Sequence, residues 1–241
     1  MRILSAVVAI VALLFSAART NAAAPNAQTA ALTPEVTVAG AHDVSPPLRN
    51  AAPGLQAGGD KRDRPLHLLP PRGSNGGHPD TALQSSVSGP LVGTTNGLNF
   101  AGIGLGDYGF APNAAPPDTN GAVGATQYVQ WVNESFAVFD KSTGAIASGF
   151  PKAGNSIWSG LKDSSGQPSG CAVNNDGDPV AQYDKAANRW VLTQFSVTNP
   201  QTYGYLQCVA VSTTSDATGS YYRYAFPEPN FNDYPKLGVW P

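Results

Sequence analysis

The stretch Pro179–Val197, PVAQYDKAANRWVLTQFSV, decides the fold class of this chain. Both of its ends are short runs rich in Val, Tyr, Phe, Trp and Thr, the side chains that suit a pleated strand. Between them lies Asp184–Asn188, where Asp caps its own turn through its side chain and Asn tolerates a positive φ. The stretch therefore predicts a β-hairpin.

The same pattern continues on both sides of this hairpin. Further strands are predicted at Gln127–Asn133, Ser135–Asp140, Tyr205–Ser212 and Ser220–Phe226. Asp140–Gly144 and Ser215–Gly219 read as two more hairpin turns. No window keeps an apolar stripe at i, i+3, i+4 and i+7, so almost no helix is expected. The chain is predicted to be all-β.

A weak internal repeat bears on the architecture. Phe136–Lys141 (FAVFDK) resembles Val180–Lys185 (VAQYDK), 44 residues further on. Propeller blades repeat at about 40–50 residues, which predicts a partial β-propeller-like domain. A β-sandwich is the alternative, because it also consists of short, regularly spaced strands. Since closed propellers need about four to eight blades, the chain is expected to be truncated at its C-terminus.

Composition divides the chain into three parts. Residues 1–22 read as a signal peptide, with Arg2 before an apolar run that is too short to span a bilayer. Residues 23–93 contain no Phe, Tyr or Trp and are rich in Pro and Gly. Such a segment buries too little area to offset its ordering entropy, so a disordered linker is expected. Residues 94–241 carry nearly all the aromatic residues and are expected to form the β domain.

Several function classes are disfavoured by what the chain lacks. The net charge is −2 with no large basic cluster, which argues against nucleic-acid binding. After signal cleavage no segment is long and apolar enough to span a membrane. No His lies between residues 94 and 241, so Ser-His-Asp catalysis and His-ligated zinc cannot be built there. The expected location is secreted, extracellular or periplasmic.

The two cysteines fit this location. Cys171 and Cys208 are the only cysteines of the chain. An even number in an oxidising compartment favours one disulfide bond. We therefore expect a bridge that fixes a polar loop around Cys171 to a strand that carries Cys208.

Carboxylates are the remaining candidates for chemistry. Asp118, Asp178 and Asp233 each lie in a turn-forming stretch, the first two just before an apolar run. Glycoside hydrolysis uses two carboxyl groups that flank the scissile bond, so these residues are candidate catalytic groups. Taken alone, each one reads better as a turn former than as a catalytic group.

Two further features suggest binding. Asn174, Asp176 and Asp178 crowd oxygen ligands into five residues, which makes calcium the one cofactor that the sequence suggests. A hydrogen-bonded Asx turn is the alternative interpretation. Trp158 lies in a predicted loop and is a candidate for stacking on a sugar ring.

A series of motifs carries a resemblance to a known group. It runs from PPDTNGAVG at Pro116–Gly124 through GDP at Gly177–Pro179, YD at Tyr183–Asp184 and RW at Arg189–Trp190 to NDYPKLGVWP at Asn232–Pro241. The series resembles poorly characterised secreted microbial proteins with a propeller-like β fold. The resemblance implies export, a Cys171–Cys208 pair and a chain that continues further, and it implies no activity.

These features lead to an expected function. We expect a secreted extracellular binding protein with a ligand such as a glycan or cell-surface polymer, which makes extracellular polysaccharide the expected partner. The alternative is a carboxylate-dependent glycoside hydrolase or lyase on a propeller scaffold. A non-catalytic stalk or matrix component is a third reading.

Overall fold

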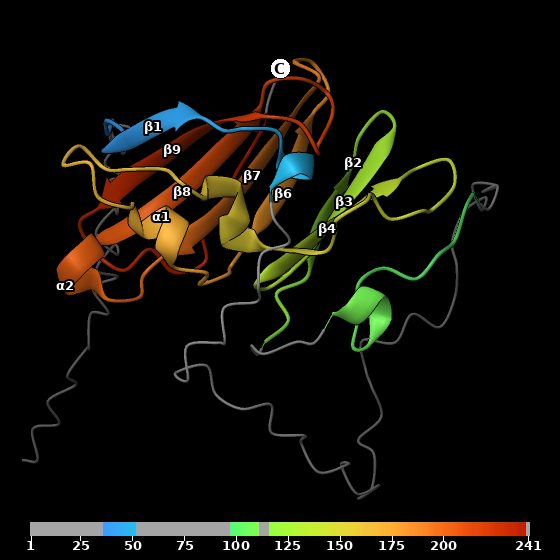
Figure 1. The fold of residues 1–241 in the computed structure, drawn as a ribbon, viewed down its shortest axis with the longest axis horizontal. Helices are drawn as coiled ribbons and strands as arrows, with labels where there is room; N and C mark the ends of the chain where they lie inside the picture. Colours follow the sequence, from blue (N-terminus) through green and yellow to red (C-terminus); the bar gives the residue numbers. More distant parts are fainter. Residues whose placement is uncertain (1–35, 52–96, 111–115, 240–241) are drawn as a thin grey trace, which may run out of the picture. The chain divides into compact units, whose positions relative to one another are not determined.

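The computed structural model describes residues 36–51, 97–110 and 116–239 (Figure 1). The chain divides into two compact units, Met1–Val36 and Thr37–Pro241, and the second is described below. The predicted signal peptide and most of the predicted linker lie outside the described residues.

Two antiparallel sheets make up the described fold (Figure 1). The first sheet has the strand order β1-β9-β8-β7-β6, and the second has the order β2-β3-β4-β5. The strands of the first sheet are β1 (Ala41–Val44), β6 (Val180–Asp184), β7 (Arg189–Ser196), β8 (Tyr205–Ser212) and β9 (Tyr221–Glu228). The strands of the second are β2 (Asn120–Val123), β3 (Gln127–Val132), β4 (Ser135–Asp140) and β5 (Lys152–Ala153). The prediction of an all-β chain is confirmed.

Among the described residues, helical structure is confined to segments of 3 to 5 residues. The α-helical turns are α1 (Gly170–Val173) and α2 (Pro200–Tyr203). The 3₁₀ turns are η1 (Leu48–Asn50), η2 (Asp107–Gly109) and η3 (Gly154–Trp158). Within the described ranges, no helix is long and apolar enough to cross a membrane.

The expected propeller remains a prediction. Neither sheet closes on itself, and the two copies of the apparent repeat occupy different positions. Strand β4, which contains most of the first copy, lies inside the second sheet, whereas β6, which contains most of the second copy, is an edge of the first. The 44-residue spacing therefore does not relate equivalent strands of the two sheets.

The two sheets share one apolar core. Trp131 and Phe136 of the second sheet and Trp190 and Leu192 of the first are fully buried in one cluster. The opposite face of the second sheet is covered too, because Phe139 packs in a second cluster with residues of 97–110. Since both faces of β4 are buried, its sequence is a continuous apolar run rather than an alternation.

Strand β1 corrects one expectation. Residues 41–44 fall within the predicted disordered linker 23–93, yet they pair with β9 along the edge of the first sheet (Figure 1). Arg223, which is 2% exposed, donates to Asp43 at 2.7 Å, and Leu48, which follows β1, is buried in the core. The linker prediction is wrong for this stretch, because its order comes from partners that lie far away in the sequence.

The predicted turn chemistry is confirmed at two hairpins. Asp140 Oδ1 accepts hydrogen bonds from the backbone N–H groups of Ser142 and Thr143, and Asp184 Oδ1 accepts one from Ala187. Gly144 and Asn188 have positive φ values of 74° and 56°. The turns are therefore encoded locally, as the sequence predicts.

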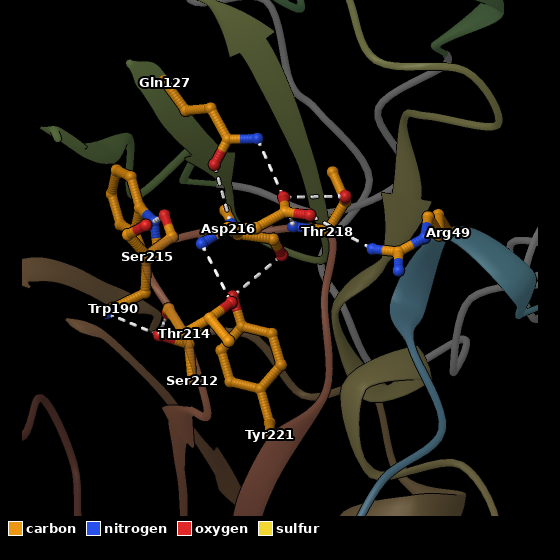
Figure 2. A network of polar contacts seen from close by, with 10 residues as sticks. Arg49, Gln127, Trp190, Ser212, Thr214, Ser215, Asp216, Thr218 and Tyr221 are labelled. Atoms are coloured by element: carbon orange, nitrogen blue, oxygen red, sulfur yellow. Dashed lines mark hydrogen bonds and ion pairs between the residues drawn. The ribbon is translucent and has the colours of Figure 1, made fainter. Parts of the chain in front are cut away.

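The third turn, between β8 and β9, is bonded to other elements rather than only to itself. Asp216 Oδ1 accepts from Thr218 N at 2.9 Å and from Gln127 Nε2 of β3 at 2.9 Å, while Oδ2 accepts from Arg49 (Figure 2). Gln127 Oε1 in turn accepts from Ala217 N at 2.7 Å. The Asp216 carboxylate thus connects the β8–β9 turn of the first sheet with β3 of the second sheet and with Arg49 of η1.

We expect Asp216→Ala to lower the free energy of unfolding at pH 7 by about 2 kcal/mol, since several hydrogen bonds to a charged acceptor are lost. Burial raises the pKa of Asp216, but the bonds from Gln127 and Thr218 and the Arg49 charge outweigh it and lower the pKa below 3.8. This contribution is present above the unfolded-state pKa and is lost as the pH falls through the folded-state value.

Urea unfolding at pH 7 and pH 3 checks this expectation, and the gap between the variant and the unmodified chain should narrow at pH 3. Asp163→Ala is the control, because Asp163 Oδ1 accepts hydrogen bonds from Ser165 and Gln167 of its own turn. An equal loss of stability for both variants would contradict the role of Asp216 as a link between elements.

Candidate functional site

Two of the predicted carboxylates are brought together by one edge strand of each sheet, β2 and β6. Asp118 precedes β2 by two residues, and Asp178 precedes β6 by two residues. Strands β2 and β6 contact each other, and Ala181 N donates to Asn120 Oδ1 at 2.8 Å. The charge of Asp178 acts on Asp118, so the two carboxylates lie near each other at this contact.

Backbone conformation at this contact is unusual. Asp118, Asn133, Asp178 and Tyr234 all have φ between 39° and 51°, the left-handed region that non-glycine residues rarely adopt. Asn133 Nδ2 donates to Asp118 Oδ2 at 3.1 Å and so links two of these residues. Left-handed non-glycine residues cluster at functional sites more often than elsewhere.

Gly177 allows the turn that carries Asn133 and the loop that carries Asp178 to lie in contact. Its φ is 82°, and a Cβ there would fall 1.9 Å from Asn133 Oδ1. Any side chain at residue 177 would push apart the turn that carries Asn133 and the loop that carries Asp178. The glycine of the sequence motif Gly177–Pro179 therefore has a steric cause.

The third predicted carboxylate comes from the segment after β9. Tyr234 N donates to Asp178 Oδ2 at 2.7 Å, which places Asp233 beside the first two carboxylates. The segment is held along the first sheet by a bond from Gln182 Nε2 to Leu237 O at 2.6 Å. Phe231 also packs against Phe195, with the two rings tilted and their centroids 5.8 Å apart.

Asp118 and Asp178 share an electrostatic environment that favours protonation. Burial raises the pKa of Asp118, and repulsion from Asp178 and Asp233 raises it further. Burial also raises the pKa of Asp178, and this outweighs the opposing effects of the Tyr234 N–H and the Lys236 charge. Carboxylates held together at such a cost are more common at functional sites than in purely structural positions.

A cavity of about 190 Å³ lies beside this cluster. Asp178, Gln182 and Asn120 line one part of it, and Tyr234 and Lys236 line another. The Lys236 ammonium lies 2.8 Å from the centroid of the Tyr234 ring. The walls thus combine a carboxylate, amides, a cation and an aromatic ring, the groups that hold a small polar ligand.

A larger cavity, of about 400 Å³, adjoins the Asp216 turn and the turn after β4. Its carboxylates are occupied, because Asp140 and Asp216 each accept several hydrogen bonds from the protein. The pKa of Asp140 is lowered by the bond from the Ser142 side chain, and that of Asp216 is lowered as well. We therefore place the candidate site at Asp178 rather than here.

Trp158 does not fit its predicted role. It is 0% exposed, lies in η3 and packs in the core shared by the two sheets. Its Nε1 donates to Val209 O at 3.4 Å. The prediction of an exposed, sugar-stacking tryptophan is wrong, because the loop turns this ring inward to fill the core.

The predicted calcium ligands bind separate protein groups. Asn174 Nδ2 donates to Thr198 O, and Asp176 Oδ2 accepts from the backbone N–H groups of Val197 and Thr198. Asp178 instead accepts from Tyr234. Among residues 36–51, 97–110 and 116–239, no group of three His, Cys, Asp or Glu side chains has the geometry to hold a metal. The bonds to Asp176 come from residues 21 and 22 positions further on, so Asp176 does not form the local Asx turn that was the alternative interpretation.

Sequence reasoning missed the residues that complete the cavity. Gln182 is one polar position in a strand, and Asn120 lies in the motif after Asp118. Tyr234 and Lys236 are within the motif Asn232–Pro241, so a signal was present without an assigned role. Asn133 has positive φ in a two-residue turn, a conformation for which Asn is enriched.

Comparison of this chain with protein-family models, with curated proteins and with solved structures gave no match. The fold and the geometry of the Asp178 cavity therefore carry the functional argument.

Proposed function

We propose that this chain is an extracellular binding protein for glycans and that a sugar unit occupies the cavity beside Asp178. One observation carries the proposal: Asp118, Asp178 and Asp233 converge from three distant parts of the sequence beside a cavity, although burial and repulsion between carboxylates oppose the ionisation of Asp118 and Asp178. The disulfide between Cys171 and Cys208 supports an extracellular location.

The lining of the cavity supports a sugar as its ligand. Asp178 offers a hydrogen-bond acceptor to hydroxyl groups, and the Tyr234 side chain is 64% exposed. A pocket of about 190 Å³ is smaller than the roughly 300–1,000 Å³ of drug-sized sites, which suits a single ring. The rest of a longer glycan would extend into solvent.

Asp178→Asn is expected to weaken binding of soluble oligosaccharides by tenfold or more, on the order of the value of a hydrogen bond to a charged group. Titration calorimetry with neutral, amino and acidic sugar tetramers measures this effect. Asp184→Asn is the matched control, because it removes a carboxylate at the opposite end of β6 and should leave affinity unchanged. Absence of binding by every oligosaccharide class would refute the proposed function.

Glycoside hydrolysis is a second candidate function, favoured by the raised pKa values of Asp118 and Asp178. A carboxyl whose pKa is raised by its surroundings can act as a general acid beside an ionised partner. The same titration mixtures show whether tetramers are shortened. Cleavage that is lost in Asp118→Asn while binding persists would identify an enzyme. Tetramers that stay intact would contradict hydrolysis and favour the binding protein.

A further inference from the structure

One part of the cavity beside Asp178 is formed by a segment without regular secondary structure. Residues 233–237, here called the strap, come after β9 and reach β6. Tyr234 and Leu237 of the strap line the cavity together with Gln182 of β6. A ligand in this cavity would therefore contact both a strand of the first sheet and the strap.

Both ends of the strap are fixed to the first sheet. Just before it, Phe231 packs against Phe195 of β7 and Tyr205 of β8, with ring centroids 5.8 Å and 5.9 Å apart. At the other end, Leu237 O accepts a hydrogen bond from Gln182 Nε2 at 2.6 Å. Because these contacts fix where the strap begins and ends, an opening movement would be confined to the residues between them.

The middle of the strap is attached through its backbone. Tyr234 N donates to Asp178 Oδ2 at 2.7 Å. Asp233, Tyr234 and Lys236 are all exposed, so burial adds little to this bond. Tyr234 also has a φ of 50°, a left-handed conformation that costs energy in a residue other than glycine. Segments with few buried contacts and an exposed backbone open locally at low free energy.

From these contacts we infer that the strap opens and closes over the Asp178 cavity, and that a ligand enters when Tyr234 N leaves Asp178 Oδ2. The inference rests on the proposed function for its ligand and adds a gating step to it. Ligand entry and ligand release then wait for the same opening, so the strap sets both rates. Loss of a simple contact would act mainly on dissociation.

Amide hydrogen exchange of the full chain tests this movement without any ligand. The Tyr234 N–H should exchange more slowly than an amide of an unfolded peptide and faster than the amides of β7, which lies inside the first sheet. Asp178→Ala removes the acceptor and should speed this exchange about tenfold, the effect of one hydrogen bond. Asp178→Asn is the matched control, because it removes the same charge but keeps an oxygen that can accept the bond.

Two results of the exchange measurement would overturn the inference. Equal exchange of the Tyr234 N–H in Asp178→Ala and in the unmodified chain would mean that this bond does not hold the strap. Protection as strong as that of the β7 amides would mean that the strap opens only when the sheet unfolds.

Binding kinetics test the gate with a ligand present. Phe231→Ala weakens the attachment of the strap but changes no residue that lines the cavity, and the fold should tolerate it because Phe231 is 51% exposed. Surface plasmon resonance with the neutral, amino and acidic sugar tetramers should show association and dissociation both several-fold faster, with affinity changed much less. Tyr222→Ala is the control, since this exposed ring lies outside the cavity lining and should leave both rates unchanged.

The outcomes distinguish the gate from the proposed function. Faster dissociation with unchanged association in Phe231→Ala would overturn the gate and leave glycan binding intact. Absence of binding by every tetramer would refute the proposed ligand, and exchange of the Tyr234 N–H would then decide whether the strap moves.

Discussion

Replacing Cys171 and Cys208 together by alanine is expected to lower the free energy of unfolding by about 4 kcal/mol. The bridge spans 37 residues of sequence, and its main effect is to restrict the unfolded chain. Both half-cystines are fully buried between α1 and β8. Since α1 is a single turn, which has little stability of its own, the bridge also holds it against the first sheet.

The position of α1 connects this effect to function. Its C-terminal end leads through Asn174 into the loop that carries Asp178. Loss of the bridge should therefore loosen one wall of the cavity as well as the core. Oligosaccharide binding by the double variant is expected to weaken even at temperatures at which the protein remains folded.

Urea unfolding of the double variant and of the oxidised chain measures the stability change. The unmodified chain in excess reductant should approach the variant, and the variant should not respond to reductant. A difference below about 1 kcal/mol would mean that the bridge adds little to the packing around β8.

Trp158→Ala is expected to lower the free energy of unfolding by about 3–5 kcal/mol, the usual cost of removing a buried aromatic side chain. The indole is 0% exposed and lies in the core formed by both sheets. It contributes the packing of η3 onto the first sheet, where Val209 O accepts from its Nε1. Trp158→Phe should cost less, because most of the volume is kept.

Stability and binding must be measured on the same samples to distinguish the two roles of this residue. The fraction of Trp158→Ala that remains folded should bind oligosaccharide like the unmodified chain. Tyr222→Ala is the control, since this ring is 46% exposed and should contribute less than about 1 kcal/mol. Normal stability with lost binding would mean that Trp158 contacts the ligand after all.

Sequence patterns predicted those strands and turns whose structure depends on residues within the same segment. The strands at residues 135–140 and 205–212 begin and end as predicted, because alternation or a continuous apolar run marks them directly. The turns at Asp140 and Asp184 follow from side chains that bond to their own loop. The pairing of Cys171 with Cys208 followed from there being only two cysteines.

Short or partner-dependent elements were missed for a common reason. Strand β5 has two residues, too few to show any period. Strand β1 is stabilised by β9 and by Arg223, which lies 180 residues further on. Both partners lie far from residues 41–44 in the sequence, so the composition of the surrounding segment predicted a linker.

The candidate site also has one part that the sequence predicted and one part that depends on tertiary packing. The sequence by itself determined that the folded part is all-β, that its two cysteines pair and that acids stand before strands at Asp118 and Asp178. Only the tertiary structure decided that these acids meet, because they share a site through contact between β2 and β6 and through the return of Tyr234 to Asp178. It likewise turned Trp158 into the core and placed Gln182 in the lining of the cavity beside Asp178. Which side chains meet depends on the packing of sheets far apart in sequence, and no local pattern records that packing.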